Sequence, residues 1–294
     1  MKVLILGAKG NLGSQLVKII DQAGDKVDFS AINEVIAWDR TEIDITDKEL
    51  VQKKISDIKP RVIINCVAFN AVDLIETDEG FETGKKLNAD AVGYLAEAAL
   101  ENGAILVHFS TDYVFDGENT SGYDEMAMPA PISKYGMTKR MGEEQIIRLS
   151  GKGLEWYIIR TSKLFGPRGT SEVAKASFFD VMLQLAREKE SIDVVNEEVS
   201  CFTYTLDLAQ AVWTLIQNDY GYGIYHIVNE DSATWYQAVL ALFEMTHTKT
   251  KVMPITAGDF PRPAKRPKFS VLKNTKFISL RSYKEALREY INSK

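Results

Sequence analysis

The amino-acid sequence predicts an α/β protein built on a doubly wound parallel sheet, with a smaller, partly interleaved C-terminal region. Three observations support this prediction. Short, nearly continuous apolar segments alternate with segments of helical periodicity over the first 160 residues, a pattern typical of parallel strands covered on both faces. A glycine cluster directly follows the first apolar segment. After Arg160 the alternation becomes less regular, which indicates the second, smaller part.

The elements of the first part follow from their apolar spacing. A first strand at 3–6 ends at the glycine cluster, and Leu12, Leu16 and Ile19 then recur at helical spacing. Gly103 directly follows a long helical pattern and is expected to cap it. The other elements predicted here are strands at 35–38, 62–65, 104–109 and 155–159, and helices at 47–58, 81–101 and 134–149.

The second part contains fewer clear strands. Strands are predicted at 192–195 and 224–228, and helices at 173–188, 206–217, 234–245 and 283–291, with a basic, proline-bearing loop at 254–268. We expect residues 1–160 to form one domain, to which 205–228 returns. Residues 161–204 and 229–294 are then expected to form the smaller region.

The composition excludes several classes of protein. Of the 294 residues, 45% are hydrophobic and 26% charged, which excludes a disordered or fibrous chain. The net charge of −6 argues against non-specific nucleic-acid binding. Two cysteines and three scattered histidines exclude a disulfide scaffold and predict no metal site. Because no signal peptide or membrane span is recognisable, a cytoplasmic protein is expected.

The glycine cluster has the spacing Gly7-x-x-Gly10-x-x-Gly13, with Asn11 and Leu12 between the last two glycines. It lies where the first strand meets the first helix. Glycines there let the backbone approach a pyrophosphate, which the helix N-terminus attracts. The alternative is a tight turn that binds nothing. The strand–turn–helix context favours a dinucleotide cofactor and a Rossmann-type sheet.

Asp39 ends the second predicted strand, where a carboxylate binds the adenosine ribose of NAD. The adjacent Arg40 could instead receive the 2′-phosphate of NADP, so the preference between NADH and NADPH stays open. A solvated turn is the alternative for both residues. Asp44 and Ile45 follow closely and could reach the adenine.

Tyr135 and Lys139 lie one helical turn apart on a predicted helix. A lysine ammonium near a phenol is expected to lower the pKa of that phenol, so that it exchanges a proton near neutral pH. The spacing alone carries little weight, because Tyr290 and Lys294 show it too. Thr111 strengthens the case, since it leaves the carboxyl end of the fourth strand, where open parallel sheets bind ligands. A cap is the alternative role for Thr111.

Together these motifs resemble the extended short-chain dehydrogenases/reductases, and more narrowly the dTDP-4-dehydrorhamnose reductase family. The resemblance covers nearly the whole chain. The motifs after Arg160 make the narrower match, because many sugar-nucleotide enzymes share those of the first half. The matching segments are the glycine turn, 65–68, 71–73 with Glu76, 110–117, Tyr135-x-x-x-Lys139, 160–162, 206–209, 225–226, 234–236 and 266–272.

The resemblance implies the reduction of a 4-keto-6-deoxy sugar on a nucleoside diphosphate by NADPH or NADH. Tyr135 would protonate the nascent alkoxide, Lys139 would hold the nicotinamide ribose, and Thr111 would orient the carbonyl. Residues along the cofactor would include Ala68, Phe69, Asn70 and Phe109. The sugar nucleotide would contact Thr111, Asp112, Lys163, Arg262 and Arg266, the two arginines binding the diphosphate.

Two departures from the family pattern fall in the region that would bind substrate. Lys163 stands where a tryptophan is usual, and residues 197–203 replace a family segment. They leave the identity of the sugar open. The related 4,6-dehydratases carry an acidic residue at the position of Tyr113, so dehydration is disfavoured. His108, His226 and Trp235 are expected to be structural.

Two alternatives remain beside the leading hypothesis, dTDP-4-dehydro-L-rhamnose reduction. One is a reductase or epimerase of another nucleotide sugar. The other is a non-catalytic partner protein resembling the regulatory subunit of methionine adenosyltransferase. The presence of Thr111, Tyr135 and Lys139 favours an enzyme. A homodimer is possible.

Overall fold

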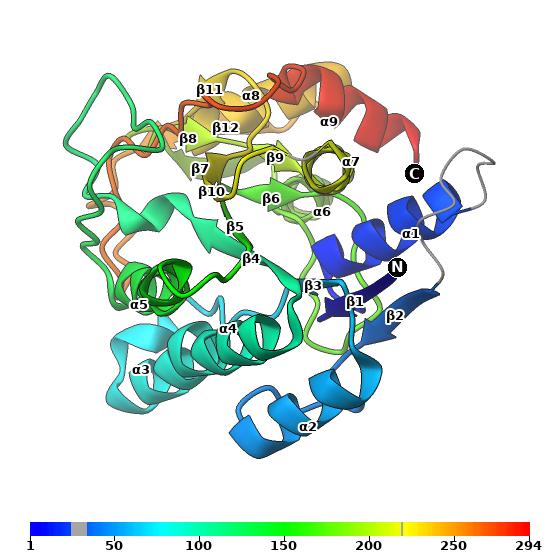
Figure 1. Ribbon diagram of the computed structural model, residues 1–294. Helices are drawn as coiled ribbons and strands as arrows, with labels where there is room; N and C mark the ends of the chain where they lie inside the picture. Colours follow the sequence, from blue (N-terminus) through cyan, green and yellow to red (C-terminus); the bar gives the residue numbers. More distant parts are fainter. Residues whose placement is uncertain (25–33, 219) are drawn as a thin grey trace.

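The computed structural model describes residues 1–24, 34–218 and 220–294. Within them, a six-stranded parallel sheet forms the centre of the molecule (Figure 1). Its order is β10 (Gly223–His226), β5 (Trp156–Thr161), β4 (Ile105–Thr111), β3 (Val62–Asn65), β1 (Lys2–Leu6) and β2 (Glu34–Trp38). The predicted doubly wound α/β fold is confirmed.

Helices cover both faces of the sheet because alternate strand residues point to opposite sides. Val3 and Ile5 pack on one side and Leu4 and Leu6 on the other. The first side is covered by α1 (Asn11–Gly24) and α7 (Thr205–Gln217), and the second by α2 (Lys48–Ile58), α4 (Ala91–Asn102) and α5 (Lys134–Ser150), next to α3 (Asp78–Lys85).

The C-terminal region packs around its own apolar core above one end of the sheet (Figure 1). Its three strand pairs are β6 (Leu164–Phe165) with β9 (Thr203–Tyr204), β7 (Ser191–Val195) with β12 (Lys251–Ile255), and β8 (Ser200–Cys201) with β11 (Ser232–Ala233). Its helices are α6 (Phe178–Glu188), α8 (Trp235–Met245) and α9 (Tyr283–Asn292). None of the helices in the described part of the chain has the length and apolarity needed to cross a membrane.

Two predicted helices differ from the structure. The helix predicted at 81–101 is interrupted by a π-helical turn, Lys86–Asp90, between α3 and α4. The helix predicted to start at 173 begins at Phe178, where Ser177 and Asp180 form a capping box. The preceding segment is not helical, because side chains bind the carbonyls that a helix would use: Arg168 donates to Ala174 at 2.8 Å and Asn11 donates to Lys175 at 2.9 Å.

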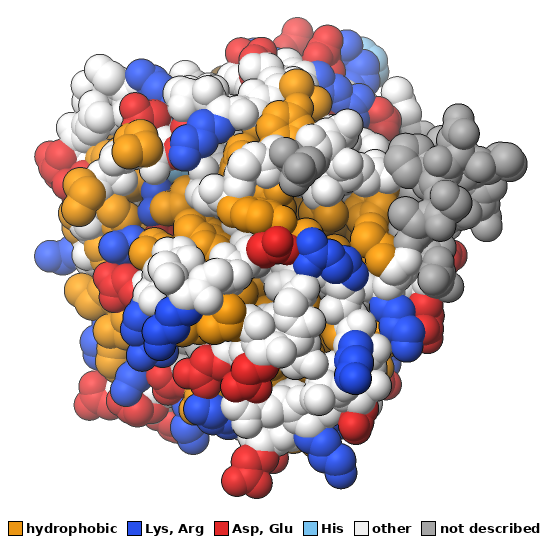
Figure 2. Space-filling view, viewed as in Figure 1, with side chains coloured by type: hydrophobic (Ala, Val, Ile, Leu, Met, Phe, Trp, Pro, Cys, Tyr) orange, Lys and Arg blue, Asp and Glu red, His pale blue; other side chains and the backbone are white. Residues whose placement is uncertain are grey.

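Figure 2 shows positive and negative side chains mixed over one face of the molecule, with apolar side chains between them. This mixture agrees with the modest net charge of −6.

A buried ion pair joins α5 to the sheet. The Arg160 guanidinium on β5 donates to both carboxylate oxygens of Glu143 on α5, at 2.9 and 2.8 Å. The Ser110 hydroxyl of β4 donates to the same carboxylate at 2.6 Å. Burial alone would raise the pKa of Glu143, but these partners hold it below its usual value. Both charged side chains are at most 1% exposed, and the only other cation on Glu143 among the described residues is Arg140, at 3.2 Å.

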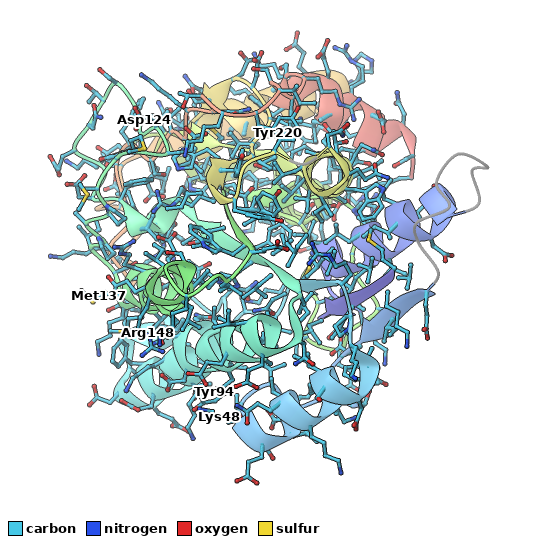
Figure 3. The ribbon with its side chains drawn as sticks, viewed as in Figure 1. Lys48, Tyr94, Asp124, Met137, Arg148 and Tyr220 are labelled. Carbon is cyan, nitrogen blue, oxygen red and sulfur yellow. The ribbon has the colours of Figure 1, made fainter. Side chains whose placement is uncertain are left out.

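We predict that Arg160→Ala lowers the free energy of unfolding by about 3–5 kcal/mol, because Glu143 stays buried, loses its two-nitrogen partner and keeps only Arg140 at 3.2 Å. Arg148→Ala is the matched control. Arg148 lies on the outside of α5 (Figure 3), is 60% exposed, and reaches Glu97 only at 3.7 Å. Its removal should cost less than about 1 kcal/mol. Denaturant titration measures both values, and similar losses for the two variants would contradict a structural role for the buried pair.

Candidate active site

The candidate catalytic residues meet at the carboxyl end of the sheet. Thr111 ends β4 and is buried, beside Thr161 at the end of β5. The chain then returns to α5, whose N-cap Ser133 accepts from the Gly136 amide at 3.1 Å. A Cβ on Gly136 would lie 2.1 Å from the Tyr113 carbonyl oxygen. Glycine at this position therefore lets the helix lie directly against the loop that follows β4.

Tyr135 lies between Thr111 and Tyr113. Its ring makes an edge contact with the Tyr113 ring at a centroid distance of 5.7 Å. Burial raises the pKa of Tyr135 to about 12, although contact with the Thr111 hydroxyl lowers it. The expectation of a lowered phenol pKa is therefore wrong for the protein alone. The reason is that Lys139 points elsewhere.

Lys139 is buried behind Tyr135. Its ammonium donates to the Phe109 carbonyl at 2.6 Å and lies 3.3 Å from Nε2 of His108. Burial lowers the pKa of Lys139 to about 8, against a smaller opposing effect of Glu143. Lys139 can therefore gain or lose a proton at a pH close to neutral.

The glycine turn has the geometry of a dinucleotide site. Gly7 has φ of +72°, and a Cβ on Gly13 would lie 2.1 Å from the Gly7 carbonyl oxygen. These contacts bring the start of α1 against the end of β1. The first amides of an α-helix have no partner within it, so those at the start of α1 can bind an anion.

The carboxylate of Asp39 lies beside this turn, where it accepts from the amides of Lys9 at 3.1 Å and Arg40 at 2.8 Å. Asp44 lies further out, and its carboxylate accepts from the amide and hydroxyl of Thr46 at 2.9 and 2.7 Å. The Ile45 side chain is buried in the core beneath the sheet, so only its backbone can face a cofactor.

A clamp holds the loop that follows β3. The side-chain amide of Asn88, in the π-helical turn, accepts from the Phe69 amide at 2.8 Å and donates to the Phe69 carbonyl at 3.0 Å. It also donates to Thr138 of α5 at 3.0 Å. Ala68 and Asn70 on either side are exposed. The loop is therefore fixed at the edge where a cofactor would lie.

Several predicted cofactor residues have structural partners. The Asn11 side chain accepts from the Gly169 amide and donates to the Lys175 carbonyl, both at 2.9 Å. It thus holds the 169–175 segment against the glycine turn. The side chains of Leu12 and Phe109 belong to the apolar core, 7% and 8% exposed.

The predicted substrate residues lie on the other side of Tyr135. Asp112 is buried, and burial raises its pKa although Ser270 donates to it at 2.6 Å. Lys163 has φ of +37° and lies over the rings of Trp235 at 3.8 Å and Phe202 at 4.8 Å. Burial lowers the pKa of Lys163 to about 7, although Asp112 and Glu198 oppose this effect. Trp235 is therefore more than core, because it contacts a candidate site residue.

Arg262 and Arg266 are paired rather than free. Arg262 donates to Glu198, and Arg266 donates with two nitrogens to Asp73, both at 2.8 Å. Both arginines line a surface cavity of about 160 Å³ together with Lys265, Lys268, Glu197 and Glu198. Burial raises the pKa of Tyr113, and the charges of Arg266 and Arg262 oppose this effect. The cavity therefore lies near Tyr113, although Thr111, Tyr135 and Lys139 do not line it.

Sequence reasoning missed four buried polar residues of the site: Asn65, Asn88, His108 and Glu143. Each is at most 1% exposed. His108 is buried as expected, and its ring lies 3.3 Å from the Lys139 side chain. The available signal was a polar residue inside an apolar strand or helix, which by itself does not name a partner.

The chain matches the family model described as the RmlD substrate binding domain over residues 1–294. It is 35% identical to the spore coat polysaccharide biosynthesis protein SpsK of Bacillus subtilis, over 100% of this chain and 98% of that protein. It is also 35% identical to a dTDP-4-dehydrorhamnose reductase of Aggregatibacter actinomycetemcomitans, over 94% and 91%.

Among solved structures, a dTDP-4-dehydrorhamnose reductase of Bacillus anthracis in complex with NADP superimposes with a TM-score of 0.88. It is 32% identical, over 100% of this chain and 99% of that one. The end-to-end family match and these relatives agree with the geometry of the site. The chain therefore belongs to the dTDP-4-dehydrorhamnose reductase family.

Proposed function

We propose that this protein reduces the 4-keto group of a nucleoside-diphosphate 4-keto-6-deoxyhexose with NADPH or NADH. The expected reaction is dTDP-4-dehydro-L-rhamnose to dTDP-L-rhamnose, the reaction for which the relatives are named. The observation that carries the proposal is the meeting of Thr111, Tyr135 and Lys139 at the sheet edge that also holds the glycine turn.

The cofactor, when bound, supplies the hydride. The glycine turn would hold its pyrophosphate, Asp39 its adenosine ribose, and Lys139 its nicotinamide ribose. The backbone contacts of Gly7 and Gly13 and the clamped loop at Phe69 fit such a group.

Tyr135 serves as the acid in this proposal. Because burial raises its pKa to about 12, the phenol keeps its proton at neutral pH and can give it to the oxygen of the reduced carbonyl. Thr111 contacts the phenol and would orient the same oxygen.

Residues 161–204 and 229–294 would bind the sugar nucleotide. Lys163 would contact the sugar, because among the described residues the Glu198 carbonyl, at 3.4 Å, is the one hydrogen-bond acceptor of its ammonium. The Glu198 carboxylate pairs with Arg262 instead, and the Asp112 carboxylate accepts from Ser270. Arg262 and Arg266 would bind the diphosphate, held in place by Glu198 and Asp73.

The direct test supplies dTDP-4-dehydro-L-rhamnose with NADPH or NADH and follows the nicotinamide absorbance. We expect consumption of the cofactor with this substrate. Tyr135→Phe should lower kcat by about 10²–10⁴-fold, because the proton donor is lost, while NADPH binding is retained.

Three outcomes would count against the proposal. Absence of turnover with any 4-keto sugar nucleotide would exclude the reductase, and a stoichiometric protein partner without turnover would favour the regulatory alternative. Full activity of Tyr135→Phe would show that another group is the acid. Preference for a different sugar in a substrate panel would revise only the identity of the substrate.

Lys163 generates a separate prediction. Lys163→Met should raise KM for the sugar nucleotide by about 10–100-fold, the value of a hydrogen bond from a charged donor, and leave NADPH binding unchanged. Since burial lowers the pKa of Lys163 to about 7, the ammonium is lost as pH rises. The wild-type KM should therefore rise between pH 6 and 8.5, and that of Lys163→Met should not. Equal KM values at pH 6 would show that Lys163 does not contact the sugar.

A further inference from the structure

A chain of buried polar groups lies behind Lys139 and has no part in the reaction described so far. Asn65 at the end of β3 and His108 in β4 are direct neighbours in the sheet. Together with Lys139 they are at most 2% exposed. Their hydrogen bonds can be assigned from one fixed point, the backbone amide of Val67.

The Val67 amide fixes the orientation of Asn65. It lies 3.0 Å from Oδ1 of Asn65 and can only donate. The other end of the side-chain amide, Nδ2, must then face Nδ1 of His108, at 3.2 Å. Because Nδ2 is only a donor, Nδ1 of the imidazole must accept. A neutral imidazole therefore carries its proton on Nε2.

Nε2 of His108 lies 3.3 Å from Nζ of Lys139. An N–H group at Nε2 needs an acceptor, and only the neutral amine of lysine offers a lone pair. A lysine ammonium would place two donors against each other. The remaining bond, from Lys139 to the Phe109 carbonyl at 2.6 Å, is compatible with either form. Every donor and acceptor in this chain of hydrogen bonds, from Val67 to Lys139, has a partner only when Lys139 is an amine.

The charged groups around Lys139 do not reverse this preference. Glu143 on the same helix favours the ammonium, but its carboxylate is neutralised by Arg160 of β5 and Arg140 of α5. Tyr135 is a neutral phenol on the side of the substrate. On the sheet side the imidazole is uncharged, because burial lowers the pKa of His108 well below its usual value.

We propose that Asn65 and His108 are positioning residues that stabilise the amine form of Lys139 through this chain, anchored on the Val67 amide. The consequence rests on the proposed function. An ammonium at Lys139 would hold the nicotinamide ribose. By favouring the amine, the chain of hydrogen bonds sets the pH above which this contact, and with it turnover, is lost.

The first test examines the unaltered protein and needs no turnover. Long-range ¹H–¹⁵N NMR shows which nitrogen of His108 carries the proton, with His108→Gln used to assign the signal. We expect the Nε2–H tautomer. An Nδ1–H tautomer or an imidazolium at pH 7 would overturn the proposal, whatever the substrate of the enzyme is.

The second test uses Asn65→Asp to reverse the direction of the hydrogen bonds that run from residue 65 through His108 to Lys139. A carboxylate still accepts from Val67 but now also accepts from Nδ1 of His108, so Nε2 becomes an acceptor that favours the lysine ammonium. The pKa of Lys139, followed by ¹³C NMR of labelled lysine and assigned with Lys139→Met, should rise by about one pH unit or more. The basic limb of the kcat profile should move with it.

The added charge of the aspartate could act on Lys139 directly, so the control repeats Asn65→Asp in a His108→Phe background. The hydrogen-bond connection from Asn65 to Lys139 is then broken. The increase in the Lys139 pKa caused by Asn65→Asp should fall to less than half of its value in the wild-type background. An equal rise in both backgrounds, or none in the first, would contradict transmission through His108. If Asn65→Asp does not fold, the tautomer measurement still decides.

Discussion

The buried contact between Glu143 and Arg160 is the interaction on which the site depends. Glu143 lies one helical turn after Lys139 on α5, while Arg160 lies in β5 and Ser110 lies in β4 next to Thr111. These bonds hold the helix that carries the acid against the two strands that carry the residues for the carbonyl and the sugar. The Glu143 carboxylate accepts four hydrogen bonds, two of them from nitrogens of Arg160. Because Arg160 and Ser110 are fixed in the sheet, these bonds fix the position of α5.

Burial then controls the charge of the site. The pKa values of Tyr135 and Asp112 are raised, and those of Lys139 and Lys163 are lowered, so every shift favours the neutral form. In such a poorly solvated site, charge that develops on a substrate oxygen interacts strongly with the few donors nearby. A phenol that keeps its proton suits reduction, in which the carbonyl oxygen has to be protonated.

Much of the fold was predictable because the six sheet strands have short apolar segments and the helices between them have clear periodicity. The short strand pairs β6–β9 and β8–β11 could not be predicted, since strands of two residues exist only through their tertiary partners. The predicted start of α6 was wrong for a similar reason. Its preceding segment is held by Asn11, 158 residues away from Gly169, and no local pattern reports such a contact.

For the site, the sequence indicated Thr111, Tyr135 and Lys139, and the structure brings them to one edge. The direction of the Tyr135 pKa shift was not predictable, because it depends on where the Lys139 side chain points. Asn65 belongs to the matching segment 65–68, but nothing in that segment or around His108 indicates a contact between the two residues. Their importance appears only when adjacent strands place them side by side and a backbone amide fixes the direction of their hydrogen bonds.

The central claim is that this site transfers a hydride to the keto carbon and that Tyr135 supplies the proton. The most direct measurement uses nicotinamide cofactor deuterated at C4 and locates the label in the sugar product by NMR. The account predicts one deuteron at C4 of the hexose, with the new hydroxyl proton derived from the protein and solvent. A product labelled at any other carbon, or an unlabelled product of changed stereochemistry, would contradict it.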